Sequence, residues 1–164
     1  LLIAAGMLPV RVMGAHEPQN VTEPHIFGMF CPFCRDTLAQ GLLGRYDYAE
    51  GVTLTQACMQ YRQTFTSWRD HVPTVKWDYY LPMPNEVQSK FAKRAHYAEV
   101  KKFRTFLEGV IGKPIGDDQI KEAIGVVDEN GVEHGVGNLI GHLVGVALRD
   151  RFGGEDVALG WGHE

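Results

Sequence analysis

The amino-acid sequence predicts an α/β fold, and two observations support this prediction. Short apolar, β-branched segments alternate with longer segments of helical periodicity, which is typical of a layered domain with mostly parallel strands. The 164 residues are 45% hydrophobic, which is enough for one hydrophobic core and little for two. We therefore predict a Rossmann-like domain with a parallel sheet, followed by a helical segment.

Charge and hydropathy argue against several classes of protein. The formal net charge of −4 gives no sign of a nucleic-acid or anionic-membrane partner. No apolar run approaches the roughly 20 residues that span a bilayer. The first residues, LLIAAGMLPV, lack the initiator methionine and basic leader of a signal peptide, as if the chain were a fragment of a larger protein. We predict a cytoplasmic protein with no nucleic-acid and no membrane partner.

The first third of the chain contains two predicted strands and one predicted helix. The segment LLIAAGM is the end of a helix that Gly6 terminates, and LPVRVMG is a short strand that Gly14 closes. Proline and glycine make residues 15–30 a loop. Helical periodicity then extends from Pro32 to Leu43, and GVTLTQA is a buried, β-branched strand.

The next elements repeat this order. The segment CMQYRQTFTSWRDH is predicted to be a helix, and TVKWDYYLPMP is a strand that runs into a loop. The helix SKFAKRAHYAEVKKFRTFLEGVIG has apolar side chains near helical spacing and ends at Gly112. A last helix, GDDQIKEAIGVVDENG, has Asp117 or Asp118 as its N-cap.

Composition divides the chain into three parts. Residues 1–84 form the predicted N-terminal α/β domain, which is incomplete at its start, and residues 85–130 form the helical segment. Residues 131–164 are a glycine-rich tail that holds nine of the 19 glycines. Within it, Gly137, Gly141 and Gly145 have the spacing of closely packed helices, but Asn138 and His142 interrupt this run, which is too short to span a membrane.

All three cysteines lie within residues 31–58, and the sequence leaves several kinds of site open. Cys31-Pro-Phe-Cys34 before a helix fits a thioredoxin-type dithiol, which would leave Cys58 unused. A structural zinc site needs four ligands, usually as two close pairs, and only one close pair is present. The thiols could also be buried apolar side chains. Iron–sulfur clusters accept distant ligands, and Cys58 follows a predicted strand, where ligands collect in parallel sheets.

Four segments of the chain contain sequence motifs in addition to the spacing of the cysteines. In chain order they are LLIAAGMLPVRVMG, MFCPFCRDTLAQGLLGRYDYAEGV, TQACMQYRQTFTSW and YYLPMPNEVQS. Together they resemble the 2-hydroxyacyl-CoA dehydratase and benzoyl-CoA reductase family from residue 1 to about residue 130. Within that family the chain is most similar to the C-type core subunit of ATP-dependent benzoyl-CoA reductase. The tail at residues 131–164 does not match the Arg- and Leu-rich helix with which family members continue.

The resemblance implies an enzyme subunit that binds a 4Fe–4S cluster near an acyl-CoA substrate. Its expected partners are a second core subunit, an ATP-hydrolysing iron–sulfur activator and ferredoxin as the electron source. The implied reaction is the ATP-driven two-electron reduction of the aromatic ring of benzoyl-CoA to a cyclic dienoyl-CoA. The alternatives are an (R)-2-hydroxyacyl-CoA dehydratase subunit and a non-catalytic zinc-binding module.

The resemblance also assigns the thiols. Cys31 matches the first cluster cysteine of the family and Cys58 the second. Cys34 fits the CPFC form of the reductase branch but is not a family-wide ligand, so it is expected either to lie next to the cluster ligands or to bind the metal as a substitute ligand. The family's third cluster cysteine lies in a second α/β domain that this chain does not contain, so the chain alone is expected to be inactive. Arg35, in the first turn of the helix, could offset thiolate charge.

Overall fold

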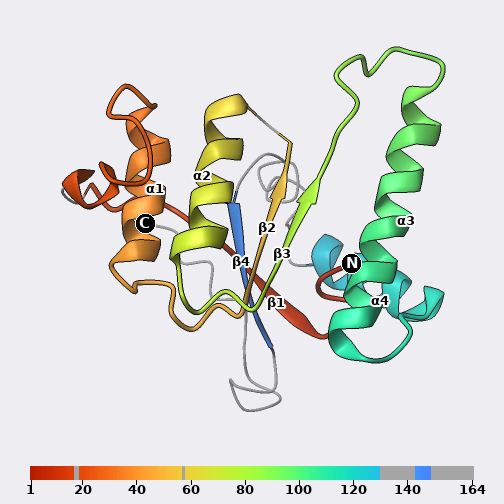
Figure 1. The fold of residues 1–164 in the computed structure, drawn as a ribbon. Helices are drawn as coiled ribbons and strands as arrows, with labels where there is room; N and C mark the ends of the chain where they lie inside the picture. The colour runs from red at the N-terminus through yellow and green to blue at the C-terminus, as the bar shows by residue number, and fades with distance from the viewer. Residues whose placement is uncertain (17–18, 57, 130–142, 149–164) are drawn as a thin grey trace.

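The computed structural model describes residues 1–16, 19–56, 58–129 and 143–148, in which strands and helices alternate (Figure 1). The strands are β1 (Met7–Arg11), β2 (Gly51–Thr55), β3 (Trp77–Leu81) and β4 (Leu143–Leu148). The helices are α1 (Pro32–Leu42), α2 (Met59–His71), α3 (Ala92–Ile111) and α4 (Asp117–Glu129), with a short 3-10 helix η1 at Gln19–Thr22. The predicted α/β class is confirmed. The predicted helix end at residues 1–7 is wrong, because residues 2–6 form turns that lead directly into β1.

The strands form one sheet in the order β1-β4-β2-β3. β2 and β3 are parallel, whereas β4 lies between β1 and β2 and is antiparallel to both. It follows that β1, β2 and β3 all run in one direction, as the strand–helix alternation predicts. β4 comes from the predicted glycine-rich tail and makes the sheet mixed. The remainder of that tail, residues 131–142 and 149–164, lies outside the described residues.

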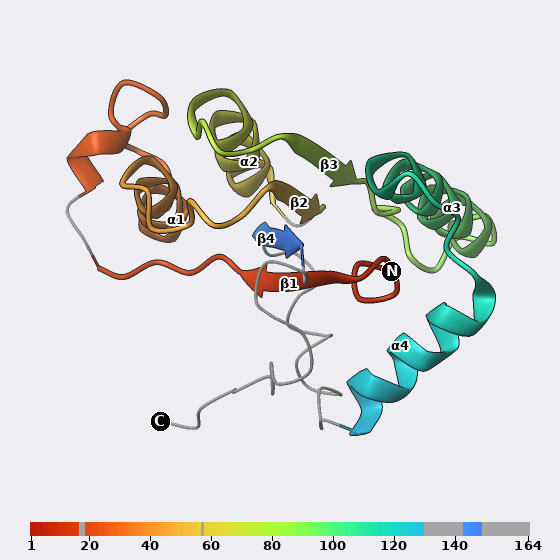
Figure 2. The ribbon, with the colours of Figure 1, turned by 90° about the horizontal axis from the view of Figure 1, so that it is seen from below.

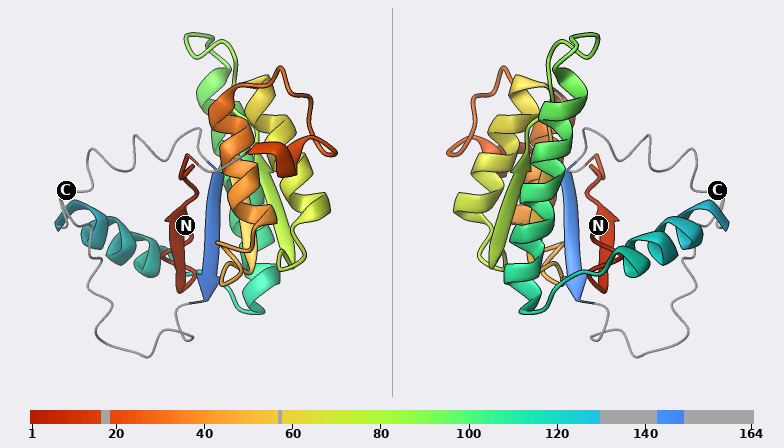
Figure 3. Two further views of the ribbon diagram at one scale, coloured as in Figure 1. Left: turned by 90° about the vertical axis from the view of Figure 1, so that its left-hand side faces the viewer. Right: turned by 90° about the vertical axis from the view of Figure 1, so that its right-hand side faces the viewer.

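Helices cover both faces of the sheet. α1 and α2 lie on one face and α3 on the other (Figure 2), and α4 lies on the β1 side, away from α1 and α2 (Figure 3). The side chains of β2 and β3 contribute to two buried clusters. Val52 and Leu54 join the cluster under α1 and α2, while Trp77 and Tyr79 pack into the cluster under α3. None of the helices in the described part of the chain has both the length and the apolar character needed to cross a bilayer.

α1 and α2 pack closely because a glycine leaves room for a large ring. Trp68 of α2 is 1% exposed, and a Cβ atom built on Gly41 of α1 would lie 2.8 Å from its ring. Asp36, buried on α1, accepts hydrogen bonds from the backbone N–H groups of Ala15 at 3.2 Å and His16 at 2.9 Å. These contacts fix α1 both to α2 and to the segment that follows β1.

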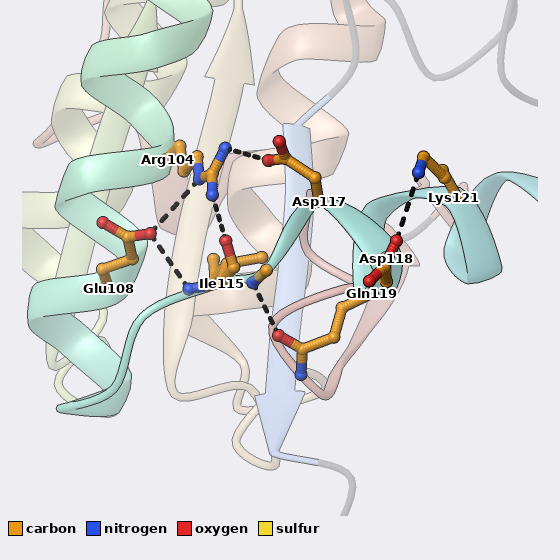
Figure 4. Close-up of polar contacts among 8 residues, drawn as sticks. Arg104, Glu108, Ile115, Asp117, Asp118, Gln119 and Lys121 are labelled. Carbon is orange, nitrogen blue, oxygen red and sulfur yellow. Dashed lines mark hydrogen bonds and ion pairs between the residues drawn. The ribbon is translucent and has the colours of Figure 1, made fainter.

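A polar network turns the chain between α3 and α4 (Figure 4). Gly112 ends α3 in the left-handed conformation with φ 69°, as its position in the sequence predicts. Arg104 of α3 pairs with Asp117 at 2.8 Å and with Glu108 at 3.2 Å, and it also donates to the carbonyl of Ile115. Glu108 in turn accepts from the Ile115 N–H at 3.0 Å.

Candidate functional site

Two of the three cysteines stand at the starts of neighbouring helices. Cys31 is the N-cap residue of α1 and Cys58 the N-cap residue of α2, and both are exposed. The two helices begin at the edge of the sheet where β2 and β3 end (Figure 1). The prediction that Cys58 follows a strand is confirmed, because β2 ends at Thr55. The fold therefore brings the N-termini of α1 and α2 to the edge at which parallel sheets bind ligands.

A side chain of α2 joins the two helix starts. The backbone N–H of Cys31 donates a hydrogen bond of 2.7 Å to Oε1 of Gln60. The Cys31 side chain makes no capping hydrogen bond of ordinary geometry. Even so, the N–H groups of Cys34 and Phe33 lie close enough to stabilise its thiolate, and they lower the pKa of Cys31. An exposed thiol with a lowered pKa is the form that binds metals and attacks electrophiles.

Cys58 is held in a similar way. Its Sγ accepts a hydrogen bond of 3.3 Å from the backbone N–H of Tyr61, which caps α2. The first N–H groups of a helix and the helix dipole both favour negative charge at the N-terminus. Cys31 and Cys58 are thus two exposed thiols, each at the N-terminus of a helix.

Cys34 differs from the other two thiols. It lies within the first turn of α1, is 2% exposed, and belongs to the core cluster under α1 and α2. The pKa of Cys34 is raised to about 12, mainly by burial and to a lesser extent by the charges of Cys31 and Cys58. The hydroxyl of Thr64 donates to the carbonyl oxygen of Cys34 at 3.4 Å and so fixes this turn against α2. At neutral pH Cys34 is a protonated thiol that faces the protein interior.

Exposed apolar side chains flank the two accessible thiols along the chain. Phe27 and Met29 precede Cys31, and Met59 follows Cys58; these three side chains are 75%, 88% and 76% exposed. Phe33, between Cys31 and Cys34, is also exposed and lies 5.7 Å from the ring of Tyr61, centroid to centroid. We call Phe27, Met29, Phe33 and Met59 the apolar rim.

Arg35 is directed toward the loop before α1. Its guanidinium donates to the carbonyl oxygen of Gly28 at 3.3 Å and lies 3.9 Å from the carboxylate of Glu23. These contacts tie the loop that contains part of the apolar rim to α1. The suggestion that Arg35 offsets thiolate charge stays a prediction.

The described residues do not form a complete metal site by themselves. No group of three or more His, Cys, Asp or Glu side chains is arranged to hold a metal ion in that part of the chain. Cys31 and Cys58 could therefore supply only part of a ligand set, with Cys34 behind them. The expectation that a cluster takes at least one ligand from elsewhere stays a prediction.

Sequence reasoning missed three polar residues that position the site. Gln60 links the two helix starts and Thr64 fixes the turn at Cys34. Gln56, which follows β2, donates to Oδ1 of Asn85 at 2.6 Å and accepts from the N–H of Met83 at 3.3 Å, so it holds the loop after β3. Their partners lie 27 to 30 positions away along the chain. No local pattern could have identified these contacts.

Comparison with known proteins finds one matching family and several relatives. A family model described as 2-hydroxyglutaryl-CoA dehydratase, D-component, matches residues 1–132, which include all three cysteines. The C-type subunit of the benzoyl-CoA reductase of Thauera aromatica is 29% identical over 132 residues, 79% of this chain and 34% of that protein.

Two further relatives carry the names of dehydratase subunits. The (R)-phenyllactyl-CoA dehydratase beta subunit of Clostridium sporogenes is 25% identical over 132 residues, 79% of this chain and 34% of that protein. The beta subunit of the (R)-2-hydroxyglutaryl-CoA dehydratase of Acidaminococcus fermentans is 27% identical over 135 residues, 79% of this chain and 35% of that protein. The chain thus spans about a third of the length of the curated relatives it matches.

Proposed function

The chain belongs to the 2-hydroxyglutaryl-CoA dehydratase D-component family, and from this premise we propose that it is part of an iron–sulfur subunit of a benzoyl-CoA reductase. The observation that carries the proposal is the pair of exposed thiols, Cys31 and Cys58, at two adjacent helix N-termini inside the matched residues. The subunit acts with a second core subunit of the same family. ATP-hydrolysing activator subunits and ferredoxin deliver the electrons.

The donor set fits part of a 4Fe–4S cluster. Iron in such clusters is held by thiolates, and both accessible thiols stand at helix N-termini, where backbone N–H groups lower the pKa of Cys31. Cys31 and Cys58 would each hold one iron, and the other ligands would come from outside the described residues. When bound, the cluster supplies electrons at low potential. Cys34, buried behind Cys31, would adjust the potential by its contact with the ligand sulfur rather than hold iron itself.

The residues around the thiols have further tasks. The hydrogen bond from Cys31 to Gln60 sets the spacing of the two ligand-bearing helix starts. When a partner or an aromatic acyl group covers the apolar rim, the rim keeps water away from the thiols. The exclusion of water strengthens the electrostatic interactions inside the site. An apolar rim is consistent with a benzoyl thioester, whose ring is reduced by two electrons to a cyclic dienoyl-CoA.

The dehydratase reaction is the second candidate. Two of the three relatives are named as beta subunits of (R)-2-hydroxyacyl-CoA dehydratases, which supports this reading. The CPFC form of Cys31 to Cys34, which resembles the reductase branch, favours the reductase. Both candidates use the same two cysteine positions.

The test is metal analysis of the anaerobically purified protein, in the assembly in which cells make it. We expect iron and acid-labile sulfide in the wild-type protein, and loss of most of both in Cys31→Ala and in Cys58→Ala. Cys34→Ala is the matched control and should keep its cluster with a shifted reduction potential. Zinc without sulfide would instead support the metal-binding module. Activity of the complete assembly with benzoyl-CoA, compared with 2-hydroxyacyl-CoA thioesters, then separates the reductase from the dehydratase.

A further inference from the structure

We propose that Cys31 and Cys34 form a dithiol site that low-molecular-weight disulfides oxidise to an intramolecular disulfide when Cys31 holds no metal. The proposal uses Cys34, which the cluster does not need as a ligand. It does not depend on the proposed function, because it requires only the two thiols and their positions on α1.

The positions of the two residues suit a disulfide. Cys31 is the N-cap of α1 and Cys34 lies one turn later, so the two residues are neighbours at the start of the helix. Two cysteines separated by two residues at a helix N-terminus are the arrangement of redox-active dithiols, in which rotation about the Cα–Cβ bonds brings the two sulfur atoms together. The Thr64 hydroxyl keeps this turn in place against α2.

Burial decides the order of the reaction. Cys31 is exposed and Cys34 is 2% exposed, so of these two thiols an external disulfide reaches Cys31 first. The Cys31 thiolate attacks one sulfur of the external disulfide, forms a mixed disulfide and releases one thiolate. The Cys34 thiol then gives its proton to water, and its sulfur attacks the Cys31 sulfur and releases the second thiolate. Two protein thiols are oxidised, and one external disulfide is reduced to two thiols.

Cys58 is the competing partner. It is exposed and its sulfur is near Cys34, but it lies on another helix and its Sγ already accepts from the Tyr61 N–H. A bond from Cys58 to Cys31 would have to displace this cap. The bond within one helix turn leaves both helix caps in place.

The Cys31 sulfur can therefore either bind a metal or form the disulfide, but it cannot do both at once. In the oxidised state Cys31 cannot bind a metal, while Cys58 stays a free thiol. Reduction by a thiol restores the ligand. The metal-free protein would thereby be unable to bind metal through Cys31 until the disulfide is reduced.

The experiment uses the whole 164-residue chain, freed of metal by a chelator and equilibrated with oxidised and reduced glutathione. After acid quenching, free thiols are alkylated and the protein is digested with trypsin. Cleavage after arginine places Cys31 and Cys34 together on the peptide of residues 12–35 and Cys58 on that of residues 46–62. We expect the first peptide to lose two hydrogen masses and carry no alkyl group. The second should be fully alkylated.

Two variants sharpen the test. Cys58→Ser should form the disulfide as the wild-type chain does. Cys34→Ser should stop at the glutathione adduct on Cys31, which then persists. A cross-link between the two peptides would overturn the proposal, and so would a wild-type chain in which Cys31 stays alkylatable under oxidising conditions. The wild-type chain and Cys58→Ser are sufficient to test the proposal, so the test stays valid even if Cys34→Ser folds poorly.

Discussion

Replacing Gln60 with alanine should loosen the residue that begins α1. The Cys31 N–H donates to Gln60 Oε1 at 2.7 Å, and this bond joins the first residue of one helix to the first turn of the other. Alanine removes the acceptor without harming α2, because alanine is at least as good a helix former as glutamine. The loss is therefore confined to the link between the two helix starts.

The size of the effect follows from the exposure of the bond. Water reaches both partners, so the free energy lost is that of an ordinary hydrogen bond, about 0.5–1.5 kcal/mol. At about 1.4 kcal/mol per factor of ten, the opening equilibrium of the Cys31 amide should rise roughly two- to twelve-fold. Amide exchange at Cys31 should accelerate by the same factor. Iron retained under a chelator challenge should fall in parallel if Cys31 is a ligand.

Hydrogen exchange of the isotope-labelled, metal-free chain measures this directly. Gln63→Ala is the matched control, because Gln63 is exposed on the same helix and its replacement should leave exchange at Cys31 unchanged. An unchanged exchange rate at Cys31 in Gln60→Ala, or an equal acceleration in both variants, would refute the reasoning.

The remaining predictions concern packing and pH. Gly41→Ala should lower the free energy of unfolding by about 1–3 kcal/mol, because the new Cβ would lie 2.8 Å from the Trp68 ring. Gly109→Ala, with nothing within 4 Å, should raise it by about 0.5–1 kcal/mol; urea unfolding measures both, and equal signs would contradict the packing argument. The His25 and His71 rings lie 4.1 Å apart, and burial, then the charge of His71, lowers the pKa of His25. The unfolded state therefore binds the proton more readily, so stability should fall as pH drops below the ordinary value of 6.5. His71→Gln should flatten this fall in thermal unfolding, and an identical pH profile would show that the pair does not couple.

The sequence by itself determined the features that depend on neighbouring residues. Periodicity and stop signals predicted α1 to α4 and the strands β1 to β3, because helices and strands follow spacings of a few residues. Motif order also identified the family, and the match to residues 1–132 confirms this. That Cys31 and Cys58 precede helices, with Cys58 after a strand, was likewise predictable.

Only the tertiary structure decided the features that depend on distant residues. β4 enters the sheet against β1, whose residues lie more than 130 positions earlier, and no local pattern in the glycine-rich tail indicates that pairing. The spacing of Cys31 and Cys34 does not show which of the two thiols is accessible. In the structure Cys31 is exposed and Cys34 is buried in the core cluster under α1 and α2. The partners of Gln60 and Thr64 likewise come from another helix. Burial and hydrogen-bond partners are set by segments that meet only when the chain folds, which is why periodicity finds the elements and misses the contacts that shape the site.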